Sequence, residues 1–421
     1  MQSLAIIGTG IAGMGCGYFL HKEFDITVYE QNSYIGGHTN TVAVDENGLS
    51  VPIDTGFMVY NDVTYPNLVR LFKELDVKTK NTSMSFSVQH VPTGLEYSGS
   101  GLNGLFAQRR NIFSPRFVKM LFDINRFNST STEVLNNLKY GNYSLSDYVA
   151  EKEYGSDFLH KYLIPMSSAV WSTPPDLMVK FPAAILIRFF YNHGFLGLNT
   201  QHQWKTIVNG SQSYRDKLIA PFANRIHSNR QIVKIKRAGN KVNITDASGR
   251  EETFDKVIVA CHGDQAIKLL DQPTEMEQRL LGKFHYQVNT ATLHNDASLM
   301  PRTKRAWSSW NYRLELGRHG SLVPSTVYYM NLLQHVSNTT DYFVSINDAG
   351  NIDASKVLTK IIYEHPIFSL ETMTAQKELH KLNTAGPVYF CGSYFGYGFH
   401  EDAFTSALDL CRTITQKDIW P

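Results

Sequence analysis

The sequence predicts an α/β protein of two domains, with the second domain inserted into the first in two pieces. Three observations support this fold class. A chain of 421 residues is longer than a single compact core usually supports. Residues 1–30 read as a strand, a glycine-rich turn, a helix and a second strand. Residues 98–204 then read as mostly helical and residues 286–346 as mostly strands, before the chain ends on a buried strand and a helix.

The opening segment predicts one βαβ unit. Strands are expected at residues 4–7 and 26–30, with a helix at residues 14–21 between them. The turn before the helix contains three glycines at the spacing that allows a tight turn, close approach of the main chain to a pyrophosphate, and close packing of helix on strand. These glycines are Gly8, Gly10 and Gly13.

The chemistry of this unit favours dinucleotide binding over a purely structural glycine turn. The amides of Ile11 and Ala12 open the helix, where free N–H groups face phosphates. Glu30 ends the second strand and precedes Gln31. A carboxylate at this place accepts hydrogen bonds from ribose hydroxyls and repels a 2′-phosphate. We therefore predict that this part of the chain binds an adenine dinucleotide.

Two later glycine motifs favour FAD over NAD as that dinucleotide. The first follows the acidic strand and would bring main chain near the pyrophosphate and ribityl chain. The second follows a predicted hairpin at residues 39–54 and would let main chain pass the isoalloxazine ring. Either motif alone also reads as an ordinary turn, and it is their order that favours FAD. The residues expected at the cofactor are Gly36, Gly37, His38, Thr55, Gly56 and Phe57.

The remaining elements divide the chain between the two domains. The plainest helices are expected at residues 65–75, 106–127, 182–190 and 213–223. Strands are expected at residues 232–235, 241–245, 254–260 and 388–391. We expect the nucleotide-binding domain to comprise residues 1–85, 205–285 and 370–421, and the substrate-binding domain residues 86–204 and 286–369.

Composition argues against several other functions. The net charge of +2 gives no field that would attract nucleic acid. His285, His294 and His335 lack the spacing of metal ligands, so no metal site is expected. No apolar stretch reaches the roughly 20 residues of a membrane span, so a cytoplasmic protein is expected.

At this point the sequence resembles the superfamily of flavin-containing amine oxidases and phytoene desaturases. The resemblance includes residues 232–235, 254–260 and 388–392 and the helix from Ala403. It implies a Rossmann-like FAD-binding domain of the GR2 type with an inserted α+β substrate domain. It also implies that the main chain of Val233 meets the adenine and that the final helix faces flavin N1 and O2. The further cofactor residues implied are Gly392, Ser393, Glu401, Asp402 and Ala403.

Three departures from the superfamily pattern stand out. Ser393 replaces the usual acid after the flavin glycine, and His38 replaces the arginine that often follows the glycine pair. The flavin-facing lysine has only Lys304 as a loose candidate. Amine oxidation as such is therefore not expected.

A narrower resemblance points to fatty acyl chemistry. Residues 165–166, 169–172, 300–301, 307–312 and 396–402 resemble a bacterial subgroup of NAD/FAD-binding, amine-oxidase-like proteins. That subgroup is associated with the modification of fatty acids. The resemblance implies an FAD-dependent oxidoreductase that oxidises or desaturates an apolar substrate, with a fatty acyl chain as one candidate, by hydride transfer to flavin N5. A double-bond isomerase and a non-enzymatic lipid-binding protein of the same fold are the alternatives.

Candidate residues for the reaction are mostly aromatic. His400, Trp310 and Tyr312 are the catalytic candidates, and Trp171, Trp307 and Tyr328 the substrate-binding ones. Aromatic residues in strands are more often plain core. Next to His400, Asp402 also reads as an ordinary helix N-cap.

Residues 105–127 predict a basic amphipathic helix. Apolar side chains alternate there with Arg109, Arg110 and Arg116. This pattern is typical of a surface that touches anionic lipid, and also of a solvated helix face. Peripheral contact with the inner membrane is thus an expectation beside the cytoplasmic location.

Overall fold

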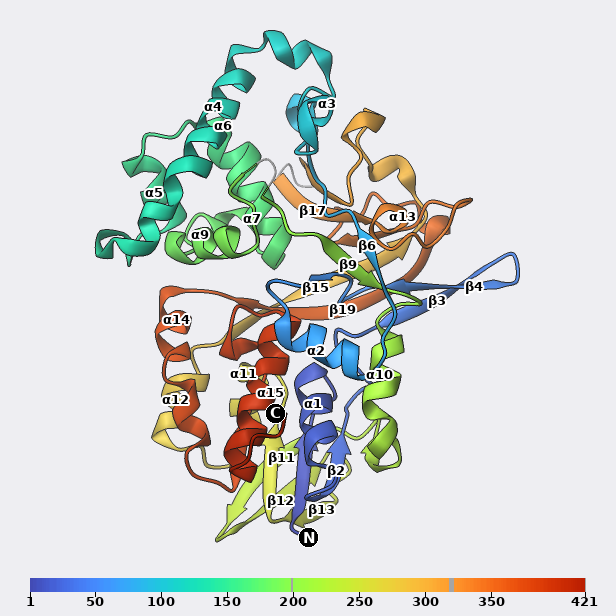
Figure 1. Ribbon diagram of the computed structural model, residues 1–421, viewed down its shortest axis with the longest axis vertical. Coiled ribbons are helices and arrows are strands. Elements are labelled where there is room, and N and C mark those ends of the chain that lie inside the picture. Colours follow the sequence, from blue (N-terminus) through green and yellow to red (C-terminus); the bar gives the residue numbers. More distant parts are fainter. Residues whose placement is uncertain (198–199, 318–321, 421) are drawn as a thin grey trace.

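The computed structural model describes residues 1–197, 200–317 and 322–420 (Figure 1). Its lower half in Figure 1 is built on a parallel five-stranded sheet with the order β10-β2-β1-β14-β20. Three separate parts of the chain supply the strands, which are β1 (Ser3–Ile7), β2 (Asp25–Tyr29), β10 (Ile226–His227), β14 (Lys256–Val259) and β20 (Val388–Phe390). The predicted α/β fold class is confirmed.

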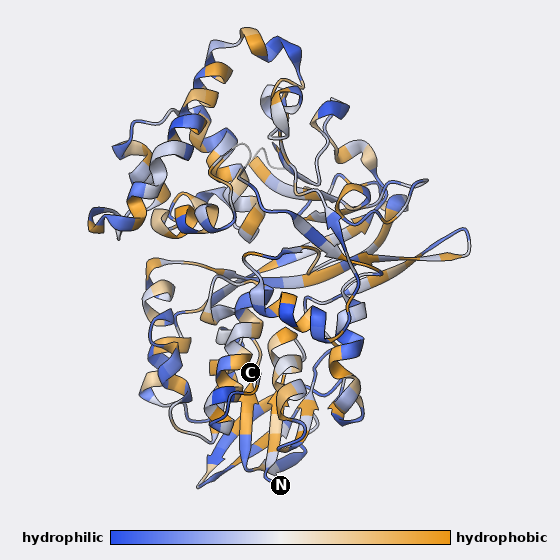
Figure 2. Cartoon of the chain, in the orientation of Figure 1, coloured by the Kyte–Doolittle hydropathy of each residue, from blue (hydrophilic) through white to orange (hydrophobic). Residues whose placement is uncertain are grey.

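Both faces of the parallel sheet are covered. Successive side chains of a strand point to opposite faces of the sheet, and here both sets are apolar. Leu4 and Ile6 point into one core, and Ala5 and Ile7 point into the other. Figure 2 shows these strands as largely hydrophobic segments, which is typical of a sheet buried on both sides. The first core contains α1 (Ile11–Leu20), α10 (Gln212–Ile219) and α15 (His400–Thr415). The second contains the antiparallel sheet of β11 (Ile232–Ala238), β12 (Lys241–Asp246) and β13 (Glu251–Phe254), with α11 (Gly263–Leu269) and α12 (Glu275–Leu281).

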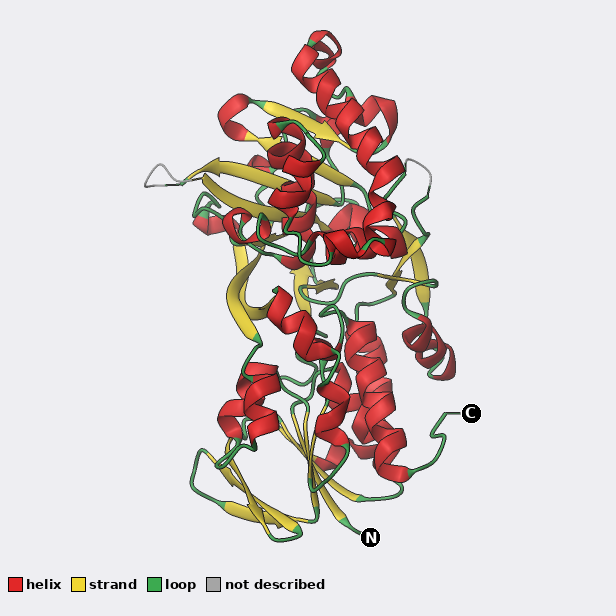
Figure 3. Ribbon diagram, turned by 90° about the vertical axis from the view of Figure 1, so that its left-hand side faces the viewer, coloured by secondary structure: helices red, strands yellow, loops and turns green. Residues whose placement is uncertain are grey.

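A seven-stranded sheet lies above the parallel sheet (Figures 1 and 3). Its neighbours pair antiparallel except β16 and β7, which are parallel. Its strands in order are β19 (Val357–Ile367), β15 (His285–His294), β18 (Phe343–Ile346), β17 (Leu322–Tyr329), β16 (Trp310–Leu316), β7 (Phe86–His90) and β8 (Leu95–Ser98).

Two smaller sheets link the halves. The predicted hairpin forms from β3 (Thr41–Glu46) and β4 (Leu49–Asp54). Three short strands, β5 (Tyr60–Asn61), β6 (Thr79–Thr82) and β9 (Trp204–Ile207), pair in the order β5-β9-β6. The helix predicted at residues 65–75 is α2 (Pro66–Glu74).

A group of helices lies beside the seven-stranded sheet, at the upper left of Figure 1, and α7 packs against its strands β16 and β19. They are α4 (Pro115–Thr130), α5 (Leu145–Glu151), α6 (Ser156–Phe158), α7 (Ile164–Trp171), α8 (Pro175–Met178) and α9 (Ala183–Asn192). Elsewhere lie α3 (Gly101–Leu105), α13 (Met330–Leu333) and α14 (Leu370–Gln376). Within the described ranges, no helix is both long and apolar enough to cross a bilayer.

Two local predictions had wrong bounds, and one strand was not predicted. The helix expected at residues 106–127 is broken into the 3₁₀ helix Arg109–Phe113 and α4, because Ser114 is extended and caps α4, whose first position is proline. The strand expected at residues 254–260 is divided between β13 and β14. Strand β19 was not predicted, because its sequence, which includes Lys360 and Pro366, shows no clear alternation of apolar and polar side chains. Lysine and proline are typical of edge strands.

Candidate functional site

One continuous cavity of about 1200 Å³ lies at the carboxyl ends of the parallel strands. Ile7 and Tyr29, which end β1 and β2, line it, as do Ala260 and Gly392, which lie one and two residues after β14 and β20. Crevices at this end of an open α/β sheet are where such folds bind ligands. The volume exceeds the roughly 300–1,000 Å³ of ordinary ligand pockets. The cavity therefore has room for a large cofactor together with a substrate.

The glycine loop forms one wall of the cavity. Gly8, Gly10, Ile11 and Ala12 line it, and a Cβ at Gly10 would have open space around it. Gly13 lies behind the loop, where a Cβ would be 2.0 Å from the carbonyl oxygen of Gly8. Gly13 thus lets α1 pack on the loop, while Gly8, Gly10, Ile11 and Ala12 form the cavity wall at the start of the helix.

Glu30 lines the cavity and also holds the loop in place. One carboxylate oxygen accepts hydrogen bonds from the amide and the hydroxyl of Thr9, at 3.1 and 2.5 Å. The other accepts from the amide and side-chain nitrogen of Asn32, at 2.9 and 3.0 Å. Gln31 lines the cavity beside it. Glu30 therefore has a structural role that the sequence did not indicate, and its contact with ribose stays a prediction.

The second glycine pair packs against the first. Gly37 has φ 59°, and a Cβ there would lie 3.3 Å from the Cα of Gly10. Gly36, with φ 126°, supports the turn from behind and does not line the cavity. The next residue, His38, lines the cavity and has a buried Nε2 without a hydrogen-bond partner among the described residues.

The third motif lies beside the start of the final helix. Thr55, Gly56 and Phe57 line the cavity. The rings of Phe57 and His400 stack with centroids 3.9 Å apart. Burial lowers the pKa of His400 to about 3, so this imidazole is neutral at physiological pH.

The C-terminal motif is only partly exposed to the cavity. Gly392, Ser393, His400 and Ala403 line it. Glu401 instead accepts hydrogen bonds from the amides of Asn67 and Leu68 at the start of α2.

Asp402 is not the N-cap of α15, as one interpretation of the sequence had it. The N-cap is Phe399, and Asp402 lies three residues into the helix, where its carboxylate accepts from the Phe399 amide at 2.8 Å. Burial raises the pKa of Asp402 to about 7.

Val233 does not line the cavity, and 44% of its surface is exposed. The pairing of β11 with β12 shifts register between Ile232 and Lys234. The neighbouring Arg230, Gln231 and Ile232 line the cavity instead.

The predicted aromatic wall is half present. Trp171, Trp310 and Tyr328 line the cavity. Trp307 and Tyr312 do not, nor does Lys304. The Trp307 indole donates to the Pro301 carbonyl at 2.8 Å, and Tyr312 is buried with Ala169 and Leu314 in a separate cluster. The Lys304 ammonium lies over the Trp307 ring, so Lys304 is not a cavity lysine.

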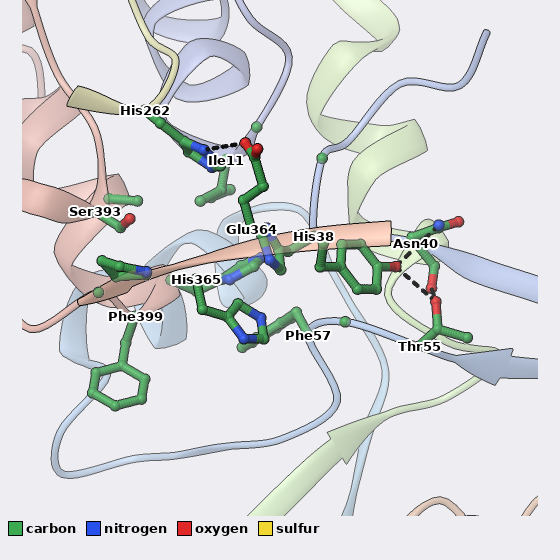
Figure 4. A pocket seen from close by; sticks show the side chains of 18 of the residues that line it. Ile11, His38, Asn40, Thr55, Phe57, His262, Glu364, His365, Ser393 and Phe399 are labelled. Carbon is green, nitrogen blue, oxygen red and sulfur yellow. Dashed lines mark hydrogen bonds and ion pairs between the residues drawn. The ribbon is translucent and has the colours of Figure 1, made fainter. Parts of the chain in front are cut away.

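A polar group from β19 was missed, because that strand was not predicted. Tyr363, Glu364 and His365 line the cavity. Figure 4 shows the His262 ring and the Glu364 carboxylate pointing toward each other, 3.3 Å apart. The ring of His262 also stacks on Tyr286, with centroids 4.2 Å apart.

The cavity fits FAD by its own geometry. Ile11 and Ala12 begin α1 and line the cavity, and a Cβ at Gly10 would meet no atom within 4 Å, so the loop leaves room for a pyrophosphate at the start of the helix.

Comparisons with known proteins agree. Residues 11–329 match the family described as flavin containing amine oxidoreductase. No curated protein matches the chain. Similar solved structures include a putrescine oxidase double mutant, with 12% identity, a TM-score of 0.69 and 99% of both chains covered. A fatty acid isomerase from P. acnes that produces CLA has 14% identity and a TM-score of 0.68, over 99% of this chain and 98% of that one. Cyclohexylamine oxidase from Brevibacterium oxydans has 13% identity and a TM-score of 0.69, and the match covers 98% of this chain and 99% of that one.

At these identities the solved structures show the fold alone, whereas the family match covers most of the chain. The expected cofactor and enzyme class are confirmed, and the non-enzymatic alternative is not retained. The chain belongs to the flavin-containing amine oxidoreductase family and is an FAD-dependent oxidoreductase.

Proposed function

We propose that this oxidoreductase oxidises or desaturates an apolar substrate, with a fatty acyl chain as the leading candidate. The observation that carries the proposal is the lining of the cavity beyond the dinucleotide loop, here called the upper chamber. The apolar or aromatic side chains that line it are Met58, Met84, Phe86, Met166, Val170, Trp171, Phe189, Phe195, Trp204, Trp310, Tyr328 and Ile346, and the polar residues Ser85, Ser172 and Gln201 also line the cavity.

Charge supports an apolar substrate over a cationic amine. Among the described lining residues the only carboxylates are Glu30 and Glu364. Glu30 holds the glycine loop and Glu364 is bound to His262, so neither belongs to the upper chamber. A diamine would enter this chamber without a counter-charge, which is costly. A hydrocarbon chain gains roughly 0.8 kcal/mol per buried CH₂.

The chain's own residues position the substrate and exclude water. FAD, when bound, supplies the oxidising chemistry by accepting a hydride. Trp171 donates its indole N–H to the Tyr397 carbonyl at 3.3 Å and thereby ties α7 to the loop before α15. Phe189 stacks on Phe399 with centroids 5.2 Å apart. The neutral ring of His400 offers a hydrogen-bonding group, not a positive charge, beside the same loop.

Anaerobic mixing of the holoenzyme with separate substrates tests this function. We expect oleate or linoleate to bleach the flavin and to yield a product lacking two hydrogen atoms, with putrescine and cyclohexylamine inert. Bleaching by the amines alone would overturn the proposal. A product of unchanged mass with a moved double bond and no lasting bleaching would replace it with isomerisation. Trp171→Ala should raise KM, whereas Trp307→Ala, outside the cavity, serves as the matched control.

We also propose that the outer helical segment, which runs from α3 to α4 (residues 101–130), contacts anionic membranes. Leu102 and Phe113 are 75% and 87% exposed. Arg109 and Arg110 next to them donate to main-chain carbonyls, and neither forms an ion pair with a described carboxylate. Arg116, by contrast, pairs with Asp157. Exposed apolar side chains beside uncompensated arginines favour an anionic lipid surface.

Vesicle flotation tests this contact. The wild type should float with vesicles of anionic lipid and less with zwitterionic ones. Phe113→Ser and the Arg109→Glu, Arg110→Glu double variant should lose flotation, whereas Lys377→Glu, an exposed control elsewhere on the surface, should keep it. Equal flotation of all four proteins would end the idea.

A further inference from the structure

Three polar side chains form a short hydrogen-bonded chain at the start of α15. The Tyr214 hydroxyl bonds to the Thr39 hydroxyl, whose oxygen lies 3.2 Å from Nε2 of His400. Tyr214 belongs to α10 and His400 to α15, while Thr39 follows the second glycine pair. Thr39 and Tyr214 are fully buried, whereas His400 lines the cavity. The chain of hydrogen bonds therefore leads from the protein core to the cavity.

Packing holds the three groups in place. The Thr39 amide donates to the Gly36 carbonyl at 2.9 Å, which fixes the main chain at Thr39. The Tyr214 ring meets the edge of the Phe57 ring, with centroids 6.2 Å apart. The other face of this contact is the stack of Phe57 on His400 described above. Phe57 thus contacts the rings at both ends of the chain.

The direction of the hydrogen bonds follows from the hydrogens and acceptors at hand. Burial raises the pKa of Tyr214 above its ordinary value, so the phenol keeps its proton at physiological pH. Its one hydrogen-bond partner within the described ranges is Thr39. The buried carboxylate of Asp54 accepts from Thr41 and Ser211 instead. The Tyr214 hydroxyl therefore donates to the Thr39 oxygen.

The tautomer of His400 follows from the next bond. The Thr39 hydroxyl hydrogen has one acceptor left, which is Nε2 of His400. A ring nitrogen that accepts carries no proton, so a neutral His400 has its proton on Nδ1. If Nε2 donated to Thr39 instead, one of the two hydroxyl hydrogens would remain in the core without an acceptor, which costs free energy. Because burial lowers the pKa of His400 to about 3, the ring is neutral and its tautomer decides what it offers a ligand.

The remaining nitrogen of His400 faces the cavity. Nδ1 has no hydrogen-bond partner among the described residues, and the protein does not enclose it as it encloses Nε2 of His38. His400 lines the cavity, so this is where the accessible nitrogen points. The ring is thus a neutral donor whose N–H is free for a ligand.

We propose that Tyr214, acting through Thr39, fixes His400 as a neutral donor whose Nδ1–H binds an acceptor atom of the flavin. Tyr214 and Thr39 are positioning residues, and His400 is the group that touches the cofactor. The inference rests on the FAD-binding role of the cavity and on the proposed substrate, whose hydrocarbon chain offers no acceptor. A donor preorganised in this way stabilises negative charge on the reduced flavin. It does so with a proton that the ring keeps at every physiological pH.

Nitrogen NMR of the full chain with isotope-labelled histidine tests the tautomer directly. Loss of one pair of resonances in His400→Gln identifies those of His400. The wild type at neutral pH should carry the proton on Nδ1 and none on Nε2, both with flavin bound and after flavin is stripped. Thr39→Val removes the donor to Nε2, so the proton should shift toward Nε2. Thr39→Ser keeps the hydroxyl and should keep the wild-type pattern.

The midpoint potential of the bound flavin is the second readout. Thr39→Val and Tyr214→Phe holoenzymes should have a lower midpoint potential than wild type, because the donor that stabilises the reduced flavin is lost from part of the population. Tyr97→Phe is the matched control. Its buried hydroxyl donates to the Lys161 carbonyl at 2.7 Å, outside the cavity, so both the tautomer and the potential should stay at the wild-type values.

Each result decides. A proton on Nε2 in the wild type, or an unchanged tautomer in Thr39→Val, would overturn the proposal. So would a changed tautomer in Thr39→Val with an unchanged potential. If Tyr214→Phe fails to fold, the difference between Thr39→Val and Thr39→Ser still decides. A chain that takes up no FAD would refute the flavoenzyme function, and bleaching by amines alone would refute the proposed substrate. The tautomer of the flavin-stripped chain is measured independently of both, which separates these failures.

Discussion

Replacing Gly13 by alanine should damage the fold before it damages chemistry. The added Cβ would lie 2.0 Å from the Gly8 carbonyl oxygen, 3.0 Å from its carbon and 3.4 Å from the Ala260 side chain. The first contact is about 1 Å too short and involves backbone, so α1 and the loop must separate. Overpacking of this kind costs about 1–3 kcal/mol or more. We expect the flavin-free protein to melt several degrees lower.

Gly10→Ala is the matched control three residues away. A Cβ there meets no atom within 4 Å, and Gly10 has φ −60°, which alanine adopts readily. Its melting temperature without flavin should stay near that of wild type. The new methyl group would nevertheless project where Gly10 now leaves the cavity wall open, so FAD affinity should fall.

The assay is thermal melting of both variants with and without FAD, together with fluorescence titration of FAD. Gly13→Ala should lose stability in both states, and Gly10→Ala should lose only the stabilisation that FAD adds. Equal melting of flavin-free Gly13→Ala and wild type would refute the steric reasoning. So would a Gly10→Ala protein that melts as low as Gly13→Ala.

Three further substitutions test individual groups. Glu30→Gln should weaken FAD binding about 10- to 100-fold, because hydrogen bonds to a charged group contribute about 1.5–3 kcal/mol. The four hydrogen bonds that the Glu30 carboxylate accepts come from Thr9 in the loop and from Asn32. Unchanged affinity in a fluorescence titration would contradict this. Because the pKa of Asp402 is raised to about 7, folding binds a proton between pH 4 and 7, so wild-type stability should fall as pH rises through that range. Asp402→Asn should flatten this slope in thermal melts, and identical slopes would count against it. His400→Gln should lower kcat and leave the shape of the pH–rate profile from pH 5 to 9 unchanged, because a ring with a pKa of about 3 does not titrate in that range. If the wild-type profile has an inflection that the variant lacks, the neutral role of His400 is disproved.

Residues in the glycine loop were predictable because their constraints are local. Gly8 turns at φ 105° and Gly13 packs on it within a few residues, so the spacing carries the information. The hairpin at residues 39–54 was predictable for the same reason. The break before α4 shows the limit of such local patterns. The helical spacing of apolar residues continues across Ser114, although Ser114 is the N-cap at which α4 begins.

The substrate side of the site depended on the tertiary structure. Trp307 and Trp310 are three residues apart in sequence, but only Trp310 lines the cavity. Both residues are tryptophans, so the residue type does not distinguish them. Strand register and the turn before β16 decide which ring points into the cavity. The aromatic pattern alone did not distinguish them.

The sequence by itself determined the nucleotide-binding unit, the family and the cofactor, because these depend on short segments in which each glycine or acid has a local geometric duty. Tertiary structure decided the upper chamber, the roles of Glu30 and Asp402, and the stack of His38 with Tyr363 and His365. That stack joins the second glycine motif to an edge strand near the other end of the chain. Local propensity acts over a few residues, whereas sheet register and the packing of distant segments set which side chains meet.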